Sequence, residues 1–212
     1  MGLEHRGVNV HDGGGILLVA QDIVVTRGGR VVLRSRELAV EAGQAVVITG
    51  PNGAGKSTLL RVLAGLARPE LGTVTWDGAD IRADRTAHAL RLGYLGHLDG
   101  IKADLTVREN LALAARLHGG LADTALGGLQ MQALGEVPAR LLSAGQRRRV
   151  ALCRLLLGSR KLWLLDEPTI GLDQRAKALL GEALTAHRAA GGMVVATTHE
   201  DLPLGEYRSV TL

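Results

Sequence analysis

The stretch "AVVITGPNGAGKST", Ala45 to Thr58, decides the fold that we predict for this chain. Its first five residues form a continuous apolar run of the kind that is buried in a parallel sheet. A glycine-rich loop follows at once, and a helical pattern then continues to Leu66. A buried strand, a glycine loop and a helix in this order are typical of a phosphate-binding α/β domain.

The loop matches the pattern G-x-x-x-x-G-K-[ST] at Gly50, Gly55, Lys56 and Ser57. Glycines let backbone N–H groups surround phosphates, Lys56 is expected to reach the β and γ oxygens, and the Ser57 hydroxyl is expected to ligate Mg²⁺. A simple glycine-rich turn is the alternative, but the place between a strand and a helix favours nucleotide binding. The predicted nucleotide-binding loop is Gly50, Pro51, Asn52, Gly53, Ala54, Gly55, Lys56, Ser57 and Thr58.

A second polar group follows the apolar run in "LWLLDEP", where Asp166 and Glu167 end a predicted buried strand. An unpaired buried charge is costly, so two carboxylates at such a place suggest a role. We expect Asp166 to hold Mg²⁺ through water and Glu167 to polarise the attacking water. Solvated strand-end residues are the alternative, and the phosphate loop favours the catalytic interpretation.

His199 ends the apolar run "MVVATTH". Ligands of open α/β sheets bind at the carboxyl ends of the strands, which is where this histidine is expected to lie. A lone histidine there is more often a satisfied polar residue. Together with the phosphate loop and the carboxylate pair, it is predicted to hydrogen-bond the γ-phosphate.

Composition limits the remaining choices. The chain has 212 residues, is 46% apolar and carries a net charge of +4, so it can bury a full core and is not expected to be disordered. No stretch approaches the roughly 20 apolar residues of a membrane span, so direct membrane insertion is not expected. The single Cys153 cannot form an internal disulfide and is predicted to be a buried thiol.

The remaining segments of the chain differ in their predicted secondary structure. Residues 1–15 are predicted to be a variable leader, and residues 16–212 a single domain. Short β-rich runs from residue 16 to 40 indicate an antiparallel patch. The pattern between about 98 and 158 is almost wholly helical and indicates an inserted helical subdomain, with a capping box at Thr106–Glu109. Strand patterns then return on either side of an amphipathic helix from about 174 to 190, which favours a parallel α/β core.

The stretch "LSAGQRRRVAL", Leu142 to Leu152, places three arginines near the start of a predicted helix. Cations there cost roughly 0.3 to 1 kcal/mol each, because the helix dipole is positive at that end. Ser143 and Gln146 form a capping box, and Gly145 lacks a Cβ, so a ligand can approach the backbone closely. The pattern therefore predicts an anion site, with an ordinary capped helix as the alternative.

These motifs in their order (GPNGAGKST, LSAGQ, LLDEPTIGLD and His199) resemble the ATP-binding cassette of ABC transporters. The resemblance covers nearly the whole chain. It implies a P-loop NTPase fold with a parallel-sheet core, an antiparallel β subdomain and an inserted helical subdomain. The stretches "GYLGHLDGIKADLTVRENL" and "ATTHEDLPLGEYRSVTL" are most similar to ATP-binding subunits of the haem exporters of cytochrome c biogenesis.

The resemblance also implies cofactors and partners. ATP and Mg²⁺ are expected, with a homodimer in which Ser143, Gly145 and Gln146 cover the nucleotide of the other copy. The segment Gly171 to Asp173 would contact its counterpart across that dimer. Integral membrane subunits are expected as partners, at the cytoplasmic face of the inner membrane, and no nucleic acid is expected. The segment around His97, with Leu98, Ile101 and Leu105, is the predicted docking surface.

Two positions depart from the family pattern. His97 stands where these cassettes usually place a glutamine that senses Mg²⁺; imidazole is a poor ligand for this ion, which prefers oxygen. No aromatic residue precedes the phosphate loop, so Arg27 is the candidate to stack on the adenine ring, with a solvated turn residue as the alternative.

The leading function predicted from the sequence is ATP hydrolysis that energises a haem exporter of c-type cytochrome biogenesis. A different small ABC exporter is the first alternative. A soluble cassette ATPase that acts on nucleic acid or the ribosome is the second, although such proteins usually carry two cassettes or a coiled-coil insert, which this chain lacks.

Overall fold

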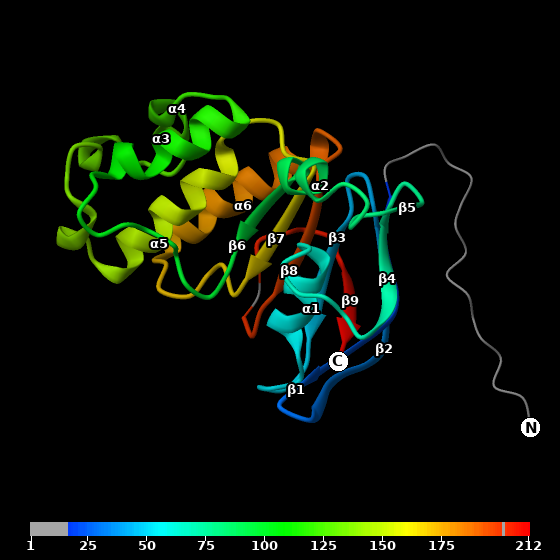
Figure 1. Ribbon diagram of the computed structural model, residues 1–212. Helices are drawn as coiled ribbons and strands as arrows, with labels where there is room; N and C mark the ends of the chain where they lie inside the picture. The colour runs from blue at the N-terminus through cyan, green and yellow to red at the C-terminus, as the bar shows by residue number, and fades with distance from the viewer. Residues whose placement is uncertain (1–16, 201) are drawn as a thin grey trace, which may run out of the picture.

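The computed structural model describes residues 17–200 and 202–212, and the predicted leader lies outside this part of the chain. A five-stranded parallel sheet forms its centre, in the order β6-β7-β8-β3-β9 (Figure 1). Its strands are β3 (Ala45–Thr49), β6 (Leu92–Leu95), β7 (Leu162–Asp166), β8 (Met193–Thr197) and β9 (Arg208–Thr211). The three apolar runs predicted as buried strands are the three central ones. The two edge strands were not predicted, because they have fewer residues and fewer apolar ones.

Alternate residues of the central strands enter two separate cores, as the period of two in a strand requires. Val46 and Ile48 belong to the core that β3 shares with the antiparallel sheet. Ala45 and Val47 face the opposite core, together with Trp163 and the helices. The central sheet is therefore covered on both faces, which explains the unbroken apolar sequence of its strands.

An antiparallel sheet covers one face, in the order β2-β1-β4-β5, and lies on the right in Figure 1. Its strands are β1 (Leu17–Arg27), β2 (Arg30–Glu41), β4 (Leu71–Trp76) and β5 (Ala79–Asp80). Helix α1 (Lys56–Leu63) packs into the same core through Leu59, Leu60 and Leu63, none of which has exposed surface. The short helix α2 (Arg85–Arg91) leads from β5 to β6. The predicted antiparallel patch is confirmed.

A group of helices covers the other face and extends to the left in Figure 1. Its α-helices are α3 (Val107–His118), α4 (Ala122–Gly128), α5 (Ala144–Cys153) and α6 (Gln174–Ala189). Three 3₁₀ turns complete it, at η1 (Gln132–Leu134), η2 (Ala139–Leu141) and η3 (Arg154–Leu156). Both capping boxes form as predicted, Thr106 with Glu109 before α3 and Ser143 with Gln146 before α5. The limits 98 and 158 for a helical subdomain stay a prediction.

Two further sequence predictions concern burial. Burial raises the pKa of the Cys153 thiol to about 12, so this side chain is a buried and unreactive thiol, as predicted. Among the described residues, no helix combines the length and the apolar character needed to cross a bilayer.

The packing of α6 against β7 sets up a pH-dependent stability. The His187 ring stacks on Trp163 with centroids 4.0 Å apart, and its Nε2 lies 3.2 Å from the Met193 carbonyl oxygen. Burial lowers the pKa of His187 to about 4, and the nearby Lys161 charge lowers it further, against the opposing effect of the Met193 bond. Folding therefore favours the neutral ring, while the unfolded chain takes up a proton near pH 6.5.

We expect the free energy of unfolding to fall by at most about 2 kcal/mol between pH 7 and pH 5 because of this one group. The His187→Phe variant keeps an aromatic ring on Trp163 and removes the titrating group, so its stability should depend less steeply on pH over this range. Urea denaturation at both pH values measures the difference. Equal losses in the variant and the parent protein would contradict the assignment to His187.

Candidate functional site

The phosphate-binding loop has a backbone that only glycine adopts without strain. Gly50, Gly53 and Gly55 have φ values of 137°, 81° and 97°. A Cβ on Gly55 would lie 2.6 Å from Leu33 Cδ2 and 3.0 Å from the Val32 carbonyl oxygen, so β2 presses directly on the loop. The glycines are therefore required by backbone shape and by close packing, as well as by the room that a phosphate needs.

The loop ends at the N-terminus of α1, whose first amides are not capped by a side chain. Free N–H groups and the positive end of the dipole make this terminus an anion site. Lys56 is buried, and its Nζ lies 2.7 Å from the Gly50 carbonyl oxygen and 3.1 Å from His199 Nε2. The lysine charge is thus held over the centre of the loop, while Ser57 is exposed beside it.

The two carboxylates lie at the carboxyl edge of β7, next to the loop. Asp166 is only 4% exposed, and the Thr197 hydroxyl donates to its Oδ1 at 2.7 Å. Glu167 follows with a φ of 48°, a left-handed conformation that costs a non-glycine residue about 1 kcal/mol or more. Its N–H donates to Thr197 Oγ1 at 3.1 Å, which helps to hold this strained backbone in place.

His199 lies two residues beyond β8, which ends at Thr197, so the prediction that it ends the strand was wrong. The turn after the strand brings the His199 N–H to 3.3 Å from Glu167 Oε2, and the ring Nε2 to 3.5 Å from Oε1. The Lys56 ammonium, the imidazole and the Glu167 carboxylate therefore lie in contact. This arrangement can hold a phosphate and polarise a water molecule beside it.

These groups line one open cavity of about 600 Å³, a size suited to a nucleotide. Val32 and Ile170 line it without having been predicted. Ten of the predicted site residues line it: Arg27, Asn52, Gly53, Gly55, Lys56, Ser57, Thr58, Asp166, Glu167 and His199. His97 lines it as well. Ser143, Gly145 and Gln146 do not contribute to this cavity within the same chain.

Arg148 joins this site to the helical group, a role that the sequence did not predict for this residue. It is 6% exposed. One terminal nitrogen donates to the carbonyl oxygens of Asp166 and Glu167, both at 2.7 Å. The other donates to the Gly96 carbonyl oxygen at 2.9 Å and to Asp99 Oδ1 at 3.0 Å. A single guanidinium thereby ties α5 to the end of β7 and to the segment after β6.

The neighbouring arginines also bind backbone carbonyls of their own chain. Arg147 donates to Leu142 at 2.6 Å, and Arg149 donates to Leu129 at 2.6 Å. The arginine charges are therefore already directed at carbonyl dipoles of their own chain and do not themselves point to an anion. The anion site predicted at the start of α5 stays a prediction. The basic run was the available signal for Arg148, but its spacing alone could not show which arginine turns inward.

The start of α5 packs closely against another segment of the same chain. A Cβ on Gly145 would lie 2.5 Å from the Gly171 carbonyl oxygen. Gly145 is half-buried, so close packing within the chain gives a reason for glycine that the sequence analysis attributed to an approaching ligand. Leu172 is buried, and Asp173 caps α6 by accepting a bond from the Ala176 N–H at 2.7 Å. The predicted contacts of these segments across a dimer stay predictions.

The oxygen donors of the cavity fit Mg²⁺. No group of three or more His, Cys, Asp or Glu side chains forms a metal cluster in the described part of the chain. The cavity instead offers the Asp166 carboxylate and the Ser57 hydroxyl. Two hard oxygen donors suit an ion that keeps several waters and is held mainly by substrate phosphates.

Fold and site together define a nucleotide-binding P-loop ATPase. The family model for "ABC transporter" matches residues 33–170. A solved structure titled "Structure of ATP binding subunit of ABC transporter" superposes with a TM-score of 0.84 at 26% identity, over 92% of this chain and 85% of that one. A putative ABC transporter ATP-binding protein from Pyrococcus furiosus, with a TM-score of 0.78 and 24% identity, covers 92% of this chain and 97% of its own and shares the fold.

Relatives with higher sequence identity define the family more narrowly. "Cytochrome c biogenesis ATP-binding export protein CcmA" of Paramagnetospirillum magneticum is 47% identical over 86% of this chain and 88% of its own. The protein of the same name from Cupriavidus pinatubonensis is 46% identical over 96% and 91%. The chain belongs to the ABC transporter family and, within it, to the CcmA family of ATP-binding export proteins. The resemblance to ABC cassettes and the predicted ATPase class are confirmed.

Arg148 gives a test of how the site is held together. In the Arg148→Gln variant, Asp99 and the strand-end carbonyls lose a charged donor inside the protein, so we expect a loss of about 3 kcal/mol in the free energy of unfolding. Arg147→Gln is the matched control, since Arg147 donates to a single carbonyl, and it should lose about 1 kcal/mol. Denaturant titration measures both. Similar losses in the two variants would show that the hydrogen bonds of Arg148 contribute no more to stability than the single bond of Arg147.

Proposed function

We propose that this chain hydrolyses ATP to drive the haem export step of c-type cytochrome biogenesis. The observation that carries the proposal is the contact of Glu167 with His199 beside Lys56, in a chain whose relatives are named as export proteins of that process. A binding-only module would not need a carboxylate at this position. The other small ABC exporters remain the alternative to be separated by experiment.

The proposed chemistry follows from the positions of the side chains. The amides of the loop and the Lys56 ammonium bind the β and γ phosphates of ATP. Glu167 accepts a proton from the water that attacks the γ phosphorus, and the bond from that phosphorus to the bridging oxygen of ADP breaks. His199 donates a hydrogen bond to a γ-phosphate oxygen, and its contact with Glu167 keeps both groups aligned.

The metal is assigned to Ser57 and Asp166. The Ser57 hydroxyl and, through water, the Asp166 carboxylate would hold Mg²⁺, which would supply positive charge to offset the negative charge that develops during phosphoryl transfer. Thr197 orients the Asp166 carboxylate through its hydroxyl bond of 2.7 Å. Arg27 lines the same cavity and is assigned to stack on the adenine ring.

The proposed active form is a homodimer. Ser143, Gly145 and Gln146 are absent from the lining of the cavity in their own chain, while Ser143 and Ala144 are exposed at the start of α5. An exposed helix N-terminus can bind an anion that belongs to a second copy. In this arrangement the start of α5 of one copy closes the nucleotide cavity of the other copy.

Integral membrane subunits are the proposed partners, which would hold the chain at the cytoplasmic face of the inner membrane. Leu98 is 82% exposed, so it does not pack into the core. Ile101 packs against the core of the helical group and supports the segment. Leu98 beside Asp99 and Lys102 provides an apolar anchor with a polar rim, as a modest interface requires.

The Glu167→Gln variant tests the proposed function directly. We expect ATP to bind with unchanged affinity while steady-state hydrolysis falls at least a hundredfold, because the water loses its base. In cells that lack the chromosomal gene, this variant should fail to support c-type cytochrome maturation. Glu182→Gln changes an exposed glutamate on α6 and is the matched control for both measurements.

Two outcomes would contradict different parts of the proposal. Hydrolysis near the parent rate in Glu167→Gln would remove this residue from its assigned role. If the parent chain hydrolyses ATP but does not restore cytochrome maturation, the haem export assignment fails and another small exporter is favoured.

Mixed dimers test the shared site. Ser143→Arg blocks the start of α5, and Lys56→Ala disables the phosphate loop, so each variant alone should be inactive. A mixture should regain activity, since a mixed dimer contains one cavity with an intact loop and an intact partner helix. ATPase rates are compared before and after mixing. No recovery, with mixed dimers demonstrated by pull-down, would contradict the proposed geometry.

A further inference from the structure

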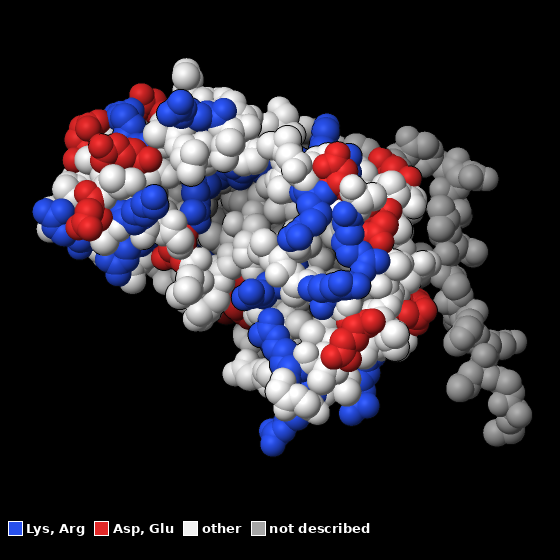
Figure 2. Space-filling view, viewed as in Figure 1, with Lys and Arg blue, Asp and Glu red and all other residues white. Residues whose placement is uncertain are grey.

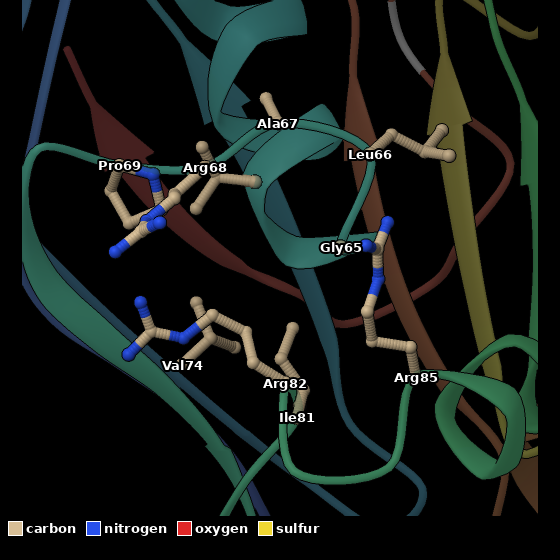
Figure 3. Close-up of a pocket in the computed structure, with 10 residues that line it drawn as sticks. Gly65, Leu66, Ala67, Arg68, Pro69, Val74, Ile81, Arg82 and Arg85 are labelled. Atoms are coloured by element: carbon tan, nitrogen blue, oxygen red, sulfur yellow. The ribbon is translucent and has the colours of Figure 1, made fainter.

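A second cavity of about 650 Å³ lies at the other end of α1, apart from the nucleotide site. The helix has eight residues, which is about 12 Å of length. The phosphate loop lies at the N-terminus of this helix, and the second cavity lies at its C-terminus. The lining residues are Val62, Gly65, Leu66, Ala67, Arg68, Pro69, Val74, Ile81, Arg82 and Arg85, drawn in Figure 3.

Three arginines surround this cavity. Figure 3 shows the guanidinium groups of Arg68 and Arg82 on one side and that of Arg85 on the other. Arg82 is paired with Asp80, to which its Nη2 donates at 2.6 Å. In the described parts of the chain, no ion pair includes Arg68 or Arg85, and none of the lining residues is acidic. The cavity therefore carries about two uncompensated positive charges.

The floor between the arginines is apolar. Val62, Val74 and Ile81 are buried beneath it, with exposed fractions of 1%, 3% and 6%. Leu66 remains 57% exposed at the rim. Cations above an apolar floor suit a ligand that carries both an anionic group and an apolar part, because each part then finds a complementary surface.

We propose that this cavity binds a phosphomonoester whose organic part is apolar. A phosphomonoester carries about −1.5 to −2 charges at neutral pH, which matches the total uncompensated charge of the cavity, and Arg85 adds to that charge from the other side. Arg68 is placed to bind the phosphate together with Nη1 of Arg82, the one terminal nitrogen that Asp80 does not use. Guanidinium groups suit this task, since they bind phosphate oxygens through two parallel N–H bonds.

The arginines are essential for this binding because the helix itself opposes it. The C-terminal end of α1 carries the negative end of the helix dipole, so an anion there gains nothing from the backbone. The ligand must be held by side-chain charge alone. Binding should consequently weaken as salt is added, more than the binding of ATP to the opposite end of α1.

The same chemistry has two sources, a phospholipid headgroup and a free phosphate ester. Figure 2 shows basic side chains gathered in the middle of the displayed face, over α1 and the segment that joins β4 to α2. Phosphatidic acid presents its phosphomonoester on a membrane, with apolar chains attached. Hexyl phosphate presents the same group in solution, attached to a short apolar chain.

The experiment uses the full chain with saturating ADP, so that the nucleotide loop is filled. Vesicles of phosphatidylcholine with and without phosphatidic acid are tested by flotation, and hexyl phosphate is titrated by calorimetry. We expect at least one of these two probes to bind, and binding to weaken at least tenfold in the double variant Arg68→Gln with Arg85→Gln. Binding to vesicles alone identifies the lipid as the source, and binding of the soluble ester identifies the free compound.

Two controls decide whether the cavity is responsible. The double variant Arg34→Gln with Arg140→Gln removes two exposed arginines elsewhere and therefore has the same net charge as the double variant of Arg68 and Arg85. Ile81→Trp enlarges a side chain that points into the cavity (Figure 3) and keeps every arginine, and ADP binding verifies that this variant is folded. The proposal requires full binding by the double variant of Arg34 and Arg140 and loss of binding by Ile81→Trp.

Equal weakening in both double variants would overturn the proposal, since it would show general attraction to a basic surface. Full binding by Ile81→Trp, tighter binding of succinate than of hexyl phosphate, or no binding of either probe would also overturn it. None of these outcomes depends on ATP hydrolysis, so the test is independent of the proposed function.

Discussion

The hydrogen bonds of Arg148 are the interaction on which the site depends most. Its guanidinium binds the last carbonyl of β7, the carbonyl of Glu167, the Gly96 carbonyl and the Asp99 carboxylate. Four hydrogen bonds from its two terminal nitrogens compensate for the burial of its charge, while its Nε has no partner in the described part of the chain. The helical group, β7 and the segment after β6 must therefore keep one relative position. The strained backbone of Glu167 is held from one side by this arginine and from the other by Thr197.

The parallel sheet contributes a second constraint, because it concentrates the polar groups at one edge. Residues of β3, β7 and β8 alternate between two cores, and this fixes the register of all three strands. Once the strands are fixed, the loop after β3, the carboxylates after β7 and His199 after β8 must meet. The contacts of Lys56, Glu167 and His199 follow from strand pairing more than from any direct attraction between them.

Helix α1 shows how one element can serve two anions by different means. At its N-terminus the free amides and the dipole attract phosphates, and glycine is needed so that the backbone can come close. At its C-terminus the dipole has the opposite sign, and a proposed ligand would depend on arginine side chains. This difference explains why the first site has a readable glycine motif, while the second has only scattered arginines from three segments.

The sequence by itself determined the central strands, the phosphate loop, the capping boxes and the order of the site residues. These features are local, because they depend on apolar period, on glycine and on side chains three or four positions apart. Only the tertiary structure decided which arginine of the run 147–149 turns inward, since that choice depends on carbonyls 18 and 52 residues away. It also decided that Gly145 packs against Gly171, and that Arg68, Arg82 and Arg85 surround one cavity. Contacts between segments distant in the chain carry no local signal, and for that reason the fold and the phosphate site could be predicted while their connection could not.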